Sequence, residues 1–341
     1  MKIRCGTFNL YQFAEPPYAW YEPENVYSEM DWLQKKTWIK EQITIMECDV
    51  IGFQEVFSPI ALRDLLKENG FNFFETVEAP LTDHENSLIF IKPVVAIASK
   101  YPIKLVEPVK VYPVITNKLP IKDFNFSRIP IKATIHIDGY GEVFFYVSHL
   151  KSKSPLIEPL NSNPSDNWDR RILETLRTRS KGHIASLVQR GTEATVLYHE
   201  ITETISNKEV PIILLGDLND DQYSPSLEAL TNREQIFEVN GIVYSDLPEE
   251  AKELIYKYRL YDAFDLSANP SGQRRSPTHY YRGVGSVLDY IILSNMFNEK
   301  NRHNIGRVSS FEVLDQHLKI DGIGNHKQSD HAQVIATIEF K

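Results

Sequence analysis

Side chains able to do acid, base or metal chemistry recur at the ends of apolar runs in this sequence. The runs at 50–53, 143–147 and 212–215 are each followed at once by a polar cluster, and a fourth cluster precedes the run at 332–338. These clusters contain Gln54 and Glu55, Ser148 and His149, Asp217 and Asn219, and Asp330 and His331. Strand ends on a rigid sheet can aim carboxylates, amides and imidazoles into one cleft, which is the layout of a metal-assisted hydrolase.

Two pairs of residues carry most of this interpretation. Asp217 and Asn219 are two residues apart, so in an extended chain both side chains point the same way and can converge on one substrate atom. The alternative is a turn, which Gly, Asp and Asn all favour. Asp289 lies within an apolar run, where a buried carboxylate requires a partner. His331 is a natural partner, since orienting a catalytic histidine is a common role of such an acid; the alternative is an Asp that accepts backbone amides.

Single charged residues would supply a metal ligand and phosphate contacts. Glu55 suits Mg²⁺, which takes one or two carboxylates and keeps several waters. His149, followed by Lys151 and Lys153, could stabilise a phosphoryl transition state. For each of these residues alone a solvated surface position is the commoner case, so the prediction depends on the clusters occurring together.

The composition indicates one large globular domain over 1–341. Of the 341 residues 42% are hydrophobic and 24% are charged, and no linker or repeat divides the chain. The net charge of −9 disfavours tight nonspecific binding of nucleic acid, which needs a basic footprint. Cys5 and Cys48 lie in apolar contexts typical of buried thiols. The N-terminus lacks a signal-peptide core and no run could span a membrane, so a cytoplasmic location is the default expectation unless a signal has been removed. A monomer is also expected.

Hydrophobic periodicity predicts two substantial helices. The first should extend from about 28 to 47, and the second from about 172 to 205, where Gly182 and Gly191 could interrupt it. Ser58 should cap a short helix that Gly70 closes. The expected apolar stripe of the first helix is Met30, Leu33, Ile39, Ile43 and Met46.

The remaining pattern is mainly that of strands, which suggests stacked sheets with helices outside. Segment 150–167 should be a surface loop. Segment 11–27 is rich in aromatic residues and should be a loop that either borders the cleft or covers the first helix. Strands are predicted at 2–10, 50–53, 71–77, 87–99, 127–137, 142–149, 212–215, 287–293, 307–314 and 332–340.

Taken in order, the polar motifs resemble those of the endonuclease/exonuclease/phosphatase (DNase I-like) superfamily. They cover nearly the whole chain, from Asn9 to His331. The resemblance implies a four-layer α/β sandwich, in which two packed, mainly antiparallel sheets are flanked by helices. The motifs are Thr7-Phe8-Asn9-Leu10, Phe53-Gln54-Glu55-Val56, Val147-Ser148-His149-Leu150-Lys151, Gly216-Asp217-Leu218-Asn219, Leu288-Asp289-Tyr290 and Ser329-Asp330-His331.

The same resemblance implies a catalytic role for five residues. His149 would help to hold the scissile phosphate. Asp217 and Asn219 would position the attacking water and the phosphate oxygens. Asp289 would pair with His331. Either Asp217 or the Asp289–His331 pair would take the proton of the water, and the sequence does not decide between them.

Three further residues would form the metal centre that the resemblance implies. Asn9 and Glu55 would flank a divalent metal, and Asp330 would be a ligand or lie close to one. The expected cofactor is Mg²⁺, with Mn²⁺ as a substitute, because the site is rich in oxygen and amide groups and has no cysteine cluster.

The expected activity is hydrolysis of a phosphodiester, with nucleic acid as the first candidate substrate and partner. A phosphomonoesterase or a lipid phosphodiesterase, of the inositol-phosphate phosphatase or sphingomyelinase type, is the second. A catalytically inactive phosphate- or protein-binding module is disfavoured because no site residue is missing. At least half of the basic residues that could frame an anionic substrate are expected to be ordinary surface. They are Lys100, Lys151, Lys153, Arg170, Arg171, Arg274, Arg275 and Arg282.

Overall fold

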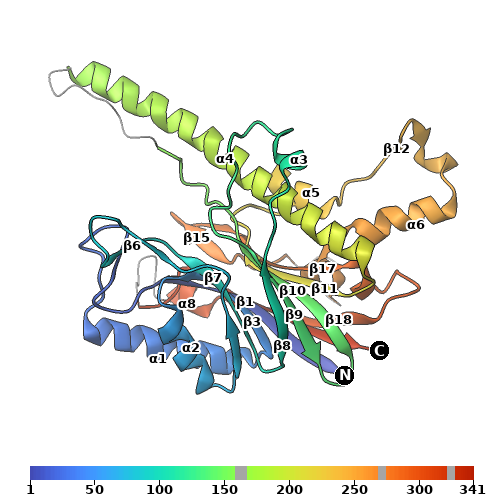
Figure 1. Ribbon diagram of the computed structural model, residues 1–341, viewed down its shortest axis with the longest axis horizontal. Coiled ribbons are helices and arrows are strands. Elements are labelled where there is room, and N and C mark those ends of the chain that lie inside the picture. Colours follow the sequence, from blue (N-terminus) through green and yellow to red (C-terminus); the bar gives the residue numbers. More distant parts are fainter. Residues whose placement is uncertain (158–166, 268–273, 321–326) are drawn as a thin grey trace.

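Two six-stranded sheets form the centre of the protein (Figure 1). The computed structural model describes residues 1–157, 167–267, 274–320 and 327–341. In the first sheet the central strand β1 pairs with β19 in antiparallel and with β3 in parallel orientation. In order across this sheet the strands are β18 (Gly306–Leu314), β19 (Gln333–Phe340), β1 (Lys2–Phe13), β3 (Val50–Val56), β7 (Val94–Ser99) and β4 (Phe73–Glu75).

The second sheet repeats this local arrangement. Its central strand β11 pairs with β10 in parallel and with β17 in antiparallel orientation, and its other pairs are antiparallel. In both sheets the parallel strands therefore end at the edge where the antiparallel neighbour begins. In order, the strands are β14 (Leu260–Asp262), β17 (Asp289–Ser294), β11 (Ile212–Asp217), β10 (Gly141–His149), β9 (Ile131–Ile137) and β8 (Ile103–Pro108).

The inner faces of the two sheets pack against each other in one apolar core. Buried Ile, Val and Phe side chains alternate along the strands, as the period of two of a β-strand requires. The sheets approach closely at Gly52, where an added Cβ would lie 2.9 Å from Leu215 and 3.0 Å from Val147. Gly52 is three residues before Glu55, so this close contact holds the site-bearing ends of β3, β10 and β11 together.

Helices cover the outer faces and complete four layers (Figure 1). Helices α1 (Glu29–Met46) and α2 (Pro59–Lys67) pack on the first sheet. Helices α4 (Trp168–Asn207) and α5 (Pro225–Thr231) pack on the second. The expected four-layer α/β sandwich with mainly antiparallel sheets is confirmed.

The buried face of α1 differs from the predicted stripe. Met30 and Leu33 are exposed at 67% and 61%. The helix instead buries Trp32 and Lys35 along with the three predicted residues that follow. The predicted helical stripe is therefore wrong for Met30 and Leu33, and it did not include the buried Lys35.

Helix α4 is continuous, so the predicted interruption at Gly182 and Gly191 is wrong. Gly182 serves a close approach instead: a Cβ there would lie 2.3 Å from the carbonyl oxygen of Leu156. The Leu156 amide also donates to the Gly182 carbonyl oxygen at 3.1 Å and to Ser186 Oγ at 3.0 Å. These contacts tie the segment after β10 to the middle of α4, whose N-terminal half projects beyond the sheets (Figure 1).

Other strand predictions need smaller corrections. β1 continues to Phe13, three residues beyond its predicted end. The run 87–99 is divided at Pro93, which has no N–H to donate, and its two parts join different sheets. β8 and β14 were not predicted. Ser58 begins α2 without capping it, since its hydroxyl accepts from Glu15 N at 2.8 Å.

Among the described residues, no helix combines the length and the apolar character that crossing a bilayer requires.

The smaller elements connect these layers. The smaller elements are β2 (Ala19–Trp20), β5 (Leu81–Thr82), β6 (Ile89–Lys92), α3 (Pro113–Thr116), β12 (Glu238–Val239), β13 (Ile242–Val243), η1 (Tyr244–Asp246), α6 (Glu249–Tyr258), α7 (Ala263–Leu266), β15 (His279–Tyr281), β16 (Val284–Ser286), η2 (Asn295–Phe297) and α8 (Gln316–Ile320).

Candidate active site

The strand register brings four of the predicted residues to one edge of the two sheets. His149 ends β10 and is paired with Asp217, which ends β11. Asp217 is in turn paired with Asp289, the first residue of β17. Asn9 lies on β1 in the facing sheet, and its side-chain Nδ2 reaches Asp217 Oδ2 at 3.0 Å. The site is therefore built between the sheets, and Ser329, whose Oγ donates to the Asn9 carbonyl oxygen at 2.6 Å, comes from a segment 320 positions further along the chain.

The carboxylate of Asp217 is the centre of this cluster. Its Oδ2 accepts from Asn9 and lies 3.4 Å from His149 Nε2 and 3.8 Å from His331 Nε2. Its Oδ1 accepts from the backbone N–H of Asn219 at 2.9 Å. Burial raises the pKa of Asp217 to about 7, and the nearby Asp289 carboxylate adds to the rise while His331 opposes it. A carboxylate with this pKa is suited to accept a proton near neutral pH.

The premise that Asn219 points with Asp217 along an extended strand is wrong. β11 ends at Asp217, and Asn219 has a left-handed backbone with φ of 54°. The Asp217 carboxylate bonds the Asn219 backbone, which is a local turn of the kind Asp and Asn favour. The side-chain amide of Asn219 donates to the carbonyl oxygen of Leu150 at 3.1 Å. The turn still places Asn219 in the site, with its side chain held against the segment after His149.

The predicted contact between Asp289 and His331 is present. His331 Nδ1 lies 2.9 Å from Asp289 Oδ2, and both side chains are buried. Burial alone lowers the pKa of His331, but the carboxylates of Asp289 and Asp217 outweigh it and raise the pKa well above the usual value. His331 is therefore an imidazolium at neutral pH in the metal-free protein.

His149 has the opposite electrostatic environment. Burial lowers its pKa well below the usual value, and the positive charges of Arg128 and His331 lower it further. A neutral imidazole thus faces Asp217 through Nε2, while His149 Nδ1 is buried without a hydrogen-bond partner among the described residues. The two histidines around Asp217 therefore differ in charge.

Glu55 and Asp330 form an acidic part of the site that fits a hard dication. Burial raises the pKa of Glu55, and the charge of Asp330 raises it further, so the two carboxylates lie within electrostatic reach of each other. Glu55 Oε2 accepts from Gln12 N at 2.9 Å, and Asp330 Oδ1 is buried with no hydrogen-bond partner in the described chain. Such oxygen donors are what Mg²⁺ or Mn²⁺ prefers.

Asn9 is held at both ends of its amide. Its Nδ2 donates to Asp217, and its Oδ1 accepts from the Tyr11 backbone at 3.0 Å. The same Oδ1 has a second lone pair, so a metal contact by Asn9 stays a prediction. Its contact with Asp217 joins the two sheets within the site.

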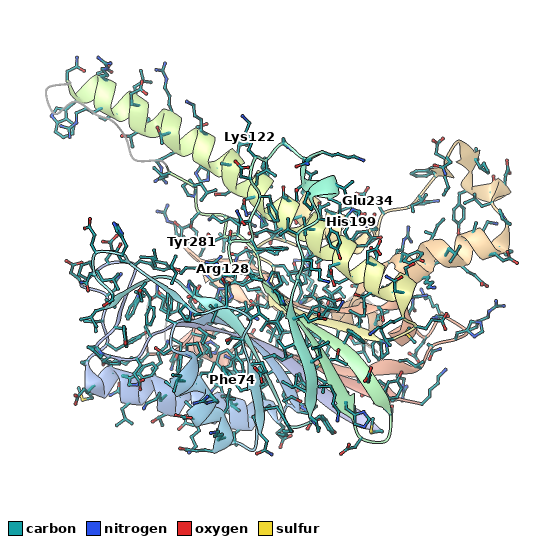
Figure 2. The ribbon with its side chains drawn as sticks, in the orientation of Figure 1. Phe74, Lys122, Arg128, His199, Glu234 and Tyr281 are labelled. Carbon is teal, nitrogen blue, oxygen red and sulfur yellow. The ribbon has the colours of Figure 1, made fainter. Side chains whose placement is uncertain are left out.

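Sequence reasoning missed three charged residues beside the site. Arg128 lies against the Tyr21 hydroxyl and within electrostatic reach of Glu55 and His149; Figure 2 shows it at the edge of the sheets below α4. Lys35 is fully buried on α1, its Nζ donates to Gln328 O at 3.2 Å, and burial lowers its pKa to about 7. His279 Nε2 lies 3.7 Å from Asp330 Oδ2.

Only Lys35 had a readable signal, because it falls at helical spacing between the apolar residues Trp32 and Ile39. Arg128 comes three residues before β9, and His279 begins the three-residue strand β15, so neither had a distinctive signal. The aromatic segment 11–27 has both expected roles. Trp20 and Tyr27 stack at 4.6 Å over α1, whereas Tyr21 meets Arg128 at the site.

Several of the predicted basic residues do not serve the site. Lys100 pairs with Asp49 at the opposite edge of the first sheet. Arg275 is buried in an ion pair with Asp262. Lys153 lies near the site but is paired with Asp220 and Asp221. Three of the eight basic residues therefore have acidic partners, and the buried Arg275 does not occupy the solvated surface position expected for it.

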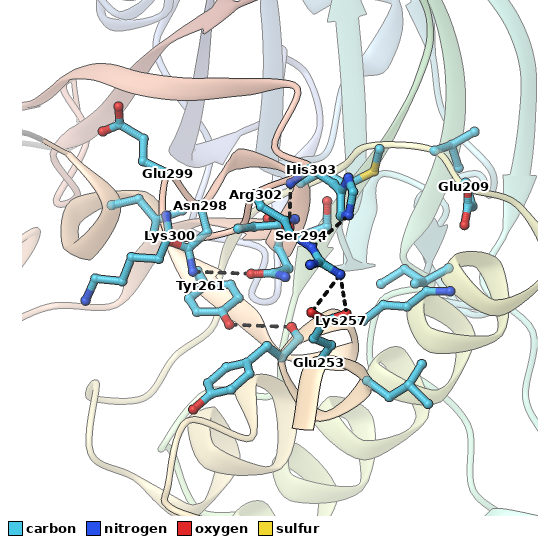
Figure 3. Close-up of a pocket in the computed structure, with 18 of the residues that line it drawn as sticks. Glu209, Glu253, Lys257, Tyr261, Ser294, Asn298, Glu299, Lys300, Arg302 and His303 are labelled. Carbon is cyan, nitrogen blue, oxygen red and sulfur yellow. Dashed lines mark hydrogen bonds and ion pairs between the residues drawn. The ribbon is translucent and has the colours of Figure 1, made fainter. Parts of the chain in front are cut away.

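A groove of about 1350 Å³ lies away from this site, between α6, the end of α4 and the turn after β17 (Figure 3). An ion pair between Arg302 and Glu253 crosses it, and Arg302 also contacts His303 at 3.0 Å. None of the predicted site residues lines this groove.

Comparison with known proteins assigns the class. A model of the Endonuclease/Exonuclease/phosphatase family matches residues 6–331. The chain therefore belongs to this family, whose members are phosphoric ester hydrolases that generally use divalent metal ions. None of the curated protein sequences compared with the chain matches it significantly.

Solved structures with the same fold include three named proteins. The human Nocturnin catalytic domain with bound sulfate shares 16% identity at a TM-score of 0.57, over 100% of this chain and 95% of that one. A mannosyl-6-phosphatase from Bacteroides thetaiotaomicron shares 15% at 0.54, over 99% and 100%. Truncated Caenorhabditis elegans TDP2 shares 12% at 0.53, over 99% and 98%. At these identities the likeness establishes the fold.

Proposed function

We propose that this protein is a Mg²⁺-dependent phosphodiesterase that cleaves nucleic acid. The observation that carries the proposal is the convergence of Asn9, His149 and His331 on the buried carboxylate of Asp217. The Asp217 carboxylate, with a pKa of about 7, can accept a proton, while the buried imidazolium of His331 beside it can donate a hydrogen bond.

In this proposal Asp217 accepts the proton of the attacking water. Its pKa is close to neutral, and the Asn9 amide and the Asn219 backbone hold both of its oxygens in place. His331, kept protonated by Asp289, donates a hydrogen bond to the phosphate and offsets its negative charge. His149 contacts the phosphate as a neutral donor.

Glu55 and Asp330 would hold the metal ion. When bound, the ion offsets charge on the phosphate and on the leaving oxygen. The orphaned oxygen of Asp330 and the electrostatic proximity of Glu55 support this assignment. The nearby Lys35 and Arg128 limit the net negative charge of the metal-free site.

The extended helix α4 supports a polymeric anion as the substrate. Its N-terminal half projects beyond the sheets, and the segment that follows His149 is hydrogen-bonded to its middle (Figure 1). Five basic residues on this half contrast with two acidic ones, in a chain whose net charge is −9. The basic residues are Arg170, Arg171, Arg177, Arg179 and Lys181. Phosphates beyond the scissile one could bind along this surface.

A lipid phosphodiesterase is the second candidate, because the same half of α4 exposes apolar side chains. Trp168, Ile172 and Leu176 are exposed at 71%, 55% and 59%. Such residues beside basic ones also suit a lipid surface. A small phosphomonoester would use neither feature.

The test compares substrates under one set of conditions. The purified protein is given DNA and RNA oligonucleotides of several lengths, bis-p-nitrophenyl phosphate, inositol phosphates, a sugar phosphate and sphingomyelin, with Mg²⁺ or a chelator. We expect Mg²⁺-dependent cleavage of oligonucleotides that improves with length. Preferred hydrolysis of sphingomyelin or of a monoester would refute the nuclease assignment, and full activity in chelator would refute the metal requirement.

Charge reversal of Arg177 and Arg179 to Glu sharpens the test. The variant should raise KM for a long oligonucleotide at least tenfold and leave KM for bis-p-nitrophenyl phosphate unchanged. Reversal of Lys40 and Lys67, which are exposed on α1 and α2, is the matched control. Equal effects of the two double variants on the oligonucleotide would show that α4 has no specific role.

A further inference from the structure

A second group of metal-binding side chains lies beside the proposed Mg²⁺ ligands. Nε2 of His279, one carboxylate oxygen of Asp330 and a ring nitrogen of His331 lie within 4.8 Å of one another. His279 Nε2 is 3.7 Å from Asp330 Oδ2, and His331 Nε2 is 3.9 Å from Asp330 Oδ1. From these residues we propose a binding site for a transition dication such as Zn²⁺ that shares Asp330 with the proposed Mg²⁺ centre and whose occupation inhibits the enzyme.

The donor set selects the class of ion. Two imidazoles and one carboxylate are typical ligands of Zn²⁺ and Co²⁺, while Mg²⁺ favours oxygen donors. Three protein ligands also leave a fourth position for water. In a tetrahedral site with bonds of about 2.0–2.1 Å the ligand atoms are about 3.3 Å apart. The two nitrogen–oxygen distances, which run to different oxygens of Asp330, exceed this by about half an ångström. One ligand atom from each residue lies within 4.8 Å of the others, so side-chain rotations must bring the three atoms closer.

His331 is oriented as metal-binding histidines usually are. Its Nδ1 is bonded to the buried carboxylate of Asp289 at 2.9 Å, so Nε2 is the nitrogen that faces Asp330 and His279. A carboxylate on the far nitrogen fixes the ring and increases the basicity of the ligating one. The buried oxygen Asp330 Oδ1, which has no hydrogen-bond partner in the described chain, faces the same space.

The β15–β16 hairpin fixes the third ligand. His279 forms a backbone bridge with His331, and their rings are 4.9 Å apart. The neighbouring Thr278 anchors the hairpin: its Oγ1 accepts from Leu288 N at 2.9 Å, and its carbonyl oxygen accepts from Ala332 N at 2.7 Å. His279 is therefore held against Asp330 by backbone contacts.

Inhibition follows from the identity of the shared residues and rests on the proposed function. An ion on Nε2 of His331 occupies the ring nitrogen through which this residue would contact the phosphate. The same ion uses Asp330, which the proposed Mg²⁺ centre also needs. Zn²⁺ should therefore inhibit at concentrations far below those of Mg²⁺.

The test measures binding separately from activity. Co²⁺, whose visible absorption reports tetrahedral nitrogen and oxygen ligands, is titrated into the full chain in excess Mg²⁺. We expect saturable binding with a tetrahedral spectrum, and competition by Zn²⁺. His279→Gln and His279→Ala should each raise the Kd for Co²⁺ at least tenfold, while His84→Gln, which removes a surface imidazole exposed at 88%, should not.

Each outcome decides the proposal. Complete displacement of Co²⁺ by Mg²⁺, an octahedral spectrum, or an unchanged Kd in both His279 variants would overturn it. Zn²⁺ inhibition, measured for each variant against its own rate without zinc, should weaken at least tenfold in the His279 variants. The Co²⁺ titration measures metal binding and does not depend on which phosphoester the enzyme hydrolyses. Failure of the nuclease assignment can therefore be distinguished from failure of the metal-site proposal.

Discussion

Asp289→Asn tests the proposed roles most directly, because it removes one charge and keeps the shape of the side chain. Asp289 is fully buried, and its Oδ2 lies 2.9 Å from His331 Nδ1. A hydrogen bond between charged groups contributes about 1.5–3 kcal/mol. If this energy is expressed in the transition state through the imidazolium, kcat should fall by about 10- to 150-fold.

The pH dependence gives the sign of the effect. Asp289 helps to raise the pKa of His331 well above its usual value. Without that charge the pKa falls, the imidazolium is lost at lower pH, and the alkaline limb of the kcat profile should move to lower pH. The stability that the pair contributes is present below the unfolded pKa of about 6.5 and is lost as the pH rises through the folded pKa. The Tm deficit of metal-free Asp289→Asn should therefore be larger at pH 5 than at pH 9.

A matched control separates this role from general destabilisation. Glu200 is also buried, and it accepts from Lys132 Nζ at 2.7 Å and from the Tyr112 hydroxyl at 2.6 Å, on the outer side of the second sheet. Glu200→Gln should lower Tm without moving the pH profile. If Asp289→Asn lowers Tm in the same way but leaves kcat and its alkaline limb unchanged, His331 does not act as a charged group in catalysis.

Two further predictions concern the carboxylates around this pair. Asp217→Asn should lower kcat at least hundredfold, because it removes the proposed base. Burial raises the pKa of Asp217 from 3.8 in the unfolded chain to about 7 in the folded protein. The stability that the neutral carboxyl contributes is therefore fully present below pH 3.8 and is lost as the pH rises through about 7. The Tm of metal-free Asp217→Asn should accordingly rise relative to that of metal-free wild type between pH 5 and pH 8. A difference in Tm that does not change with pH would contradict the burial argument. Glu55→Gln should raise the Mg²⁺ concentration for half-maximal activity and be partly rescued by excess Mg²⁺; an unchanged midpoint would remove Glu55 from the metal site.

The sequence by itself determined the family and predicted candidate site residues that the fold brings close together. Apolar runs with a period of two predicted the core strands, since alternation reports which side of a strand is buried. The polar clusters at their ends made Glu55, His149, Asp217 and His331 candidates without any coordinates. The link between Asp289 and His331 was also predictable, because a buried carboxylate needs a partner.

The tertiary structure decided how these residues are grouped and charged. That Asn9 meets Asp217 follows from the packing of two sheets at Gly52, which no local pattern encodes. The turn at Asn219 depends on a left-handed backbone that the extended-strand interpretation did not include. His149 and His331 are the same residue type, yet burial dominates the pKa of one and carboxylates that of the other. Contacts between distant segments create the electrostatic surroundings of each histidine, so only the folded chain distinguishes the neutral histidine from the charged one.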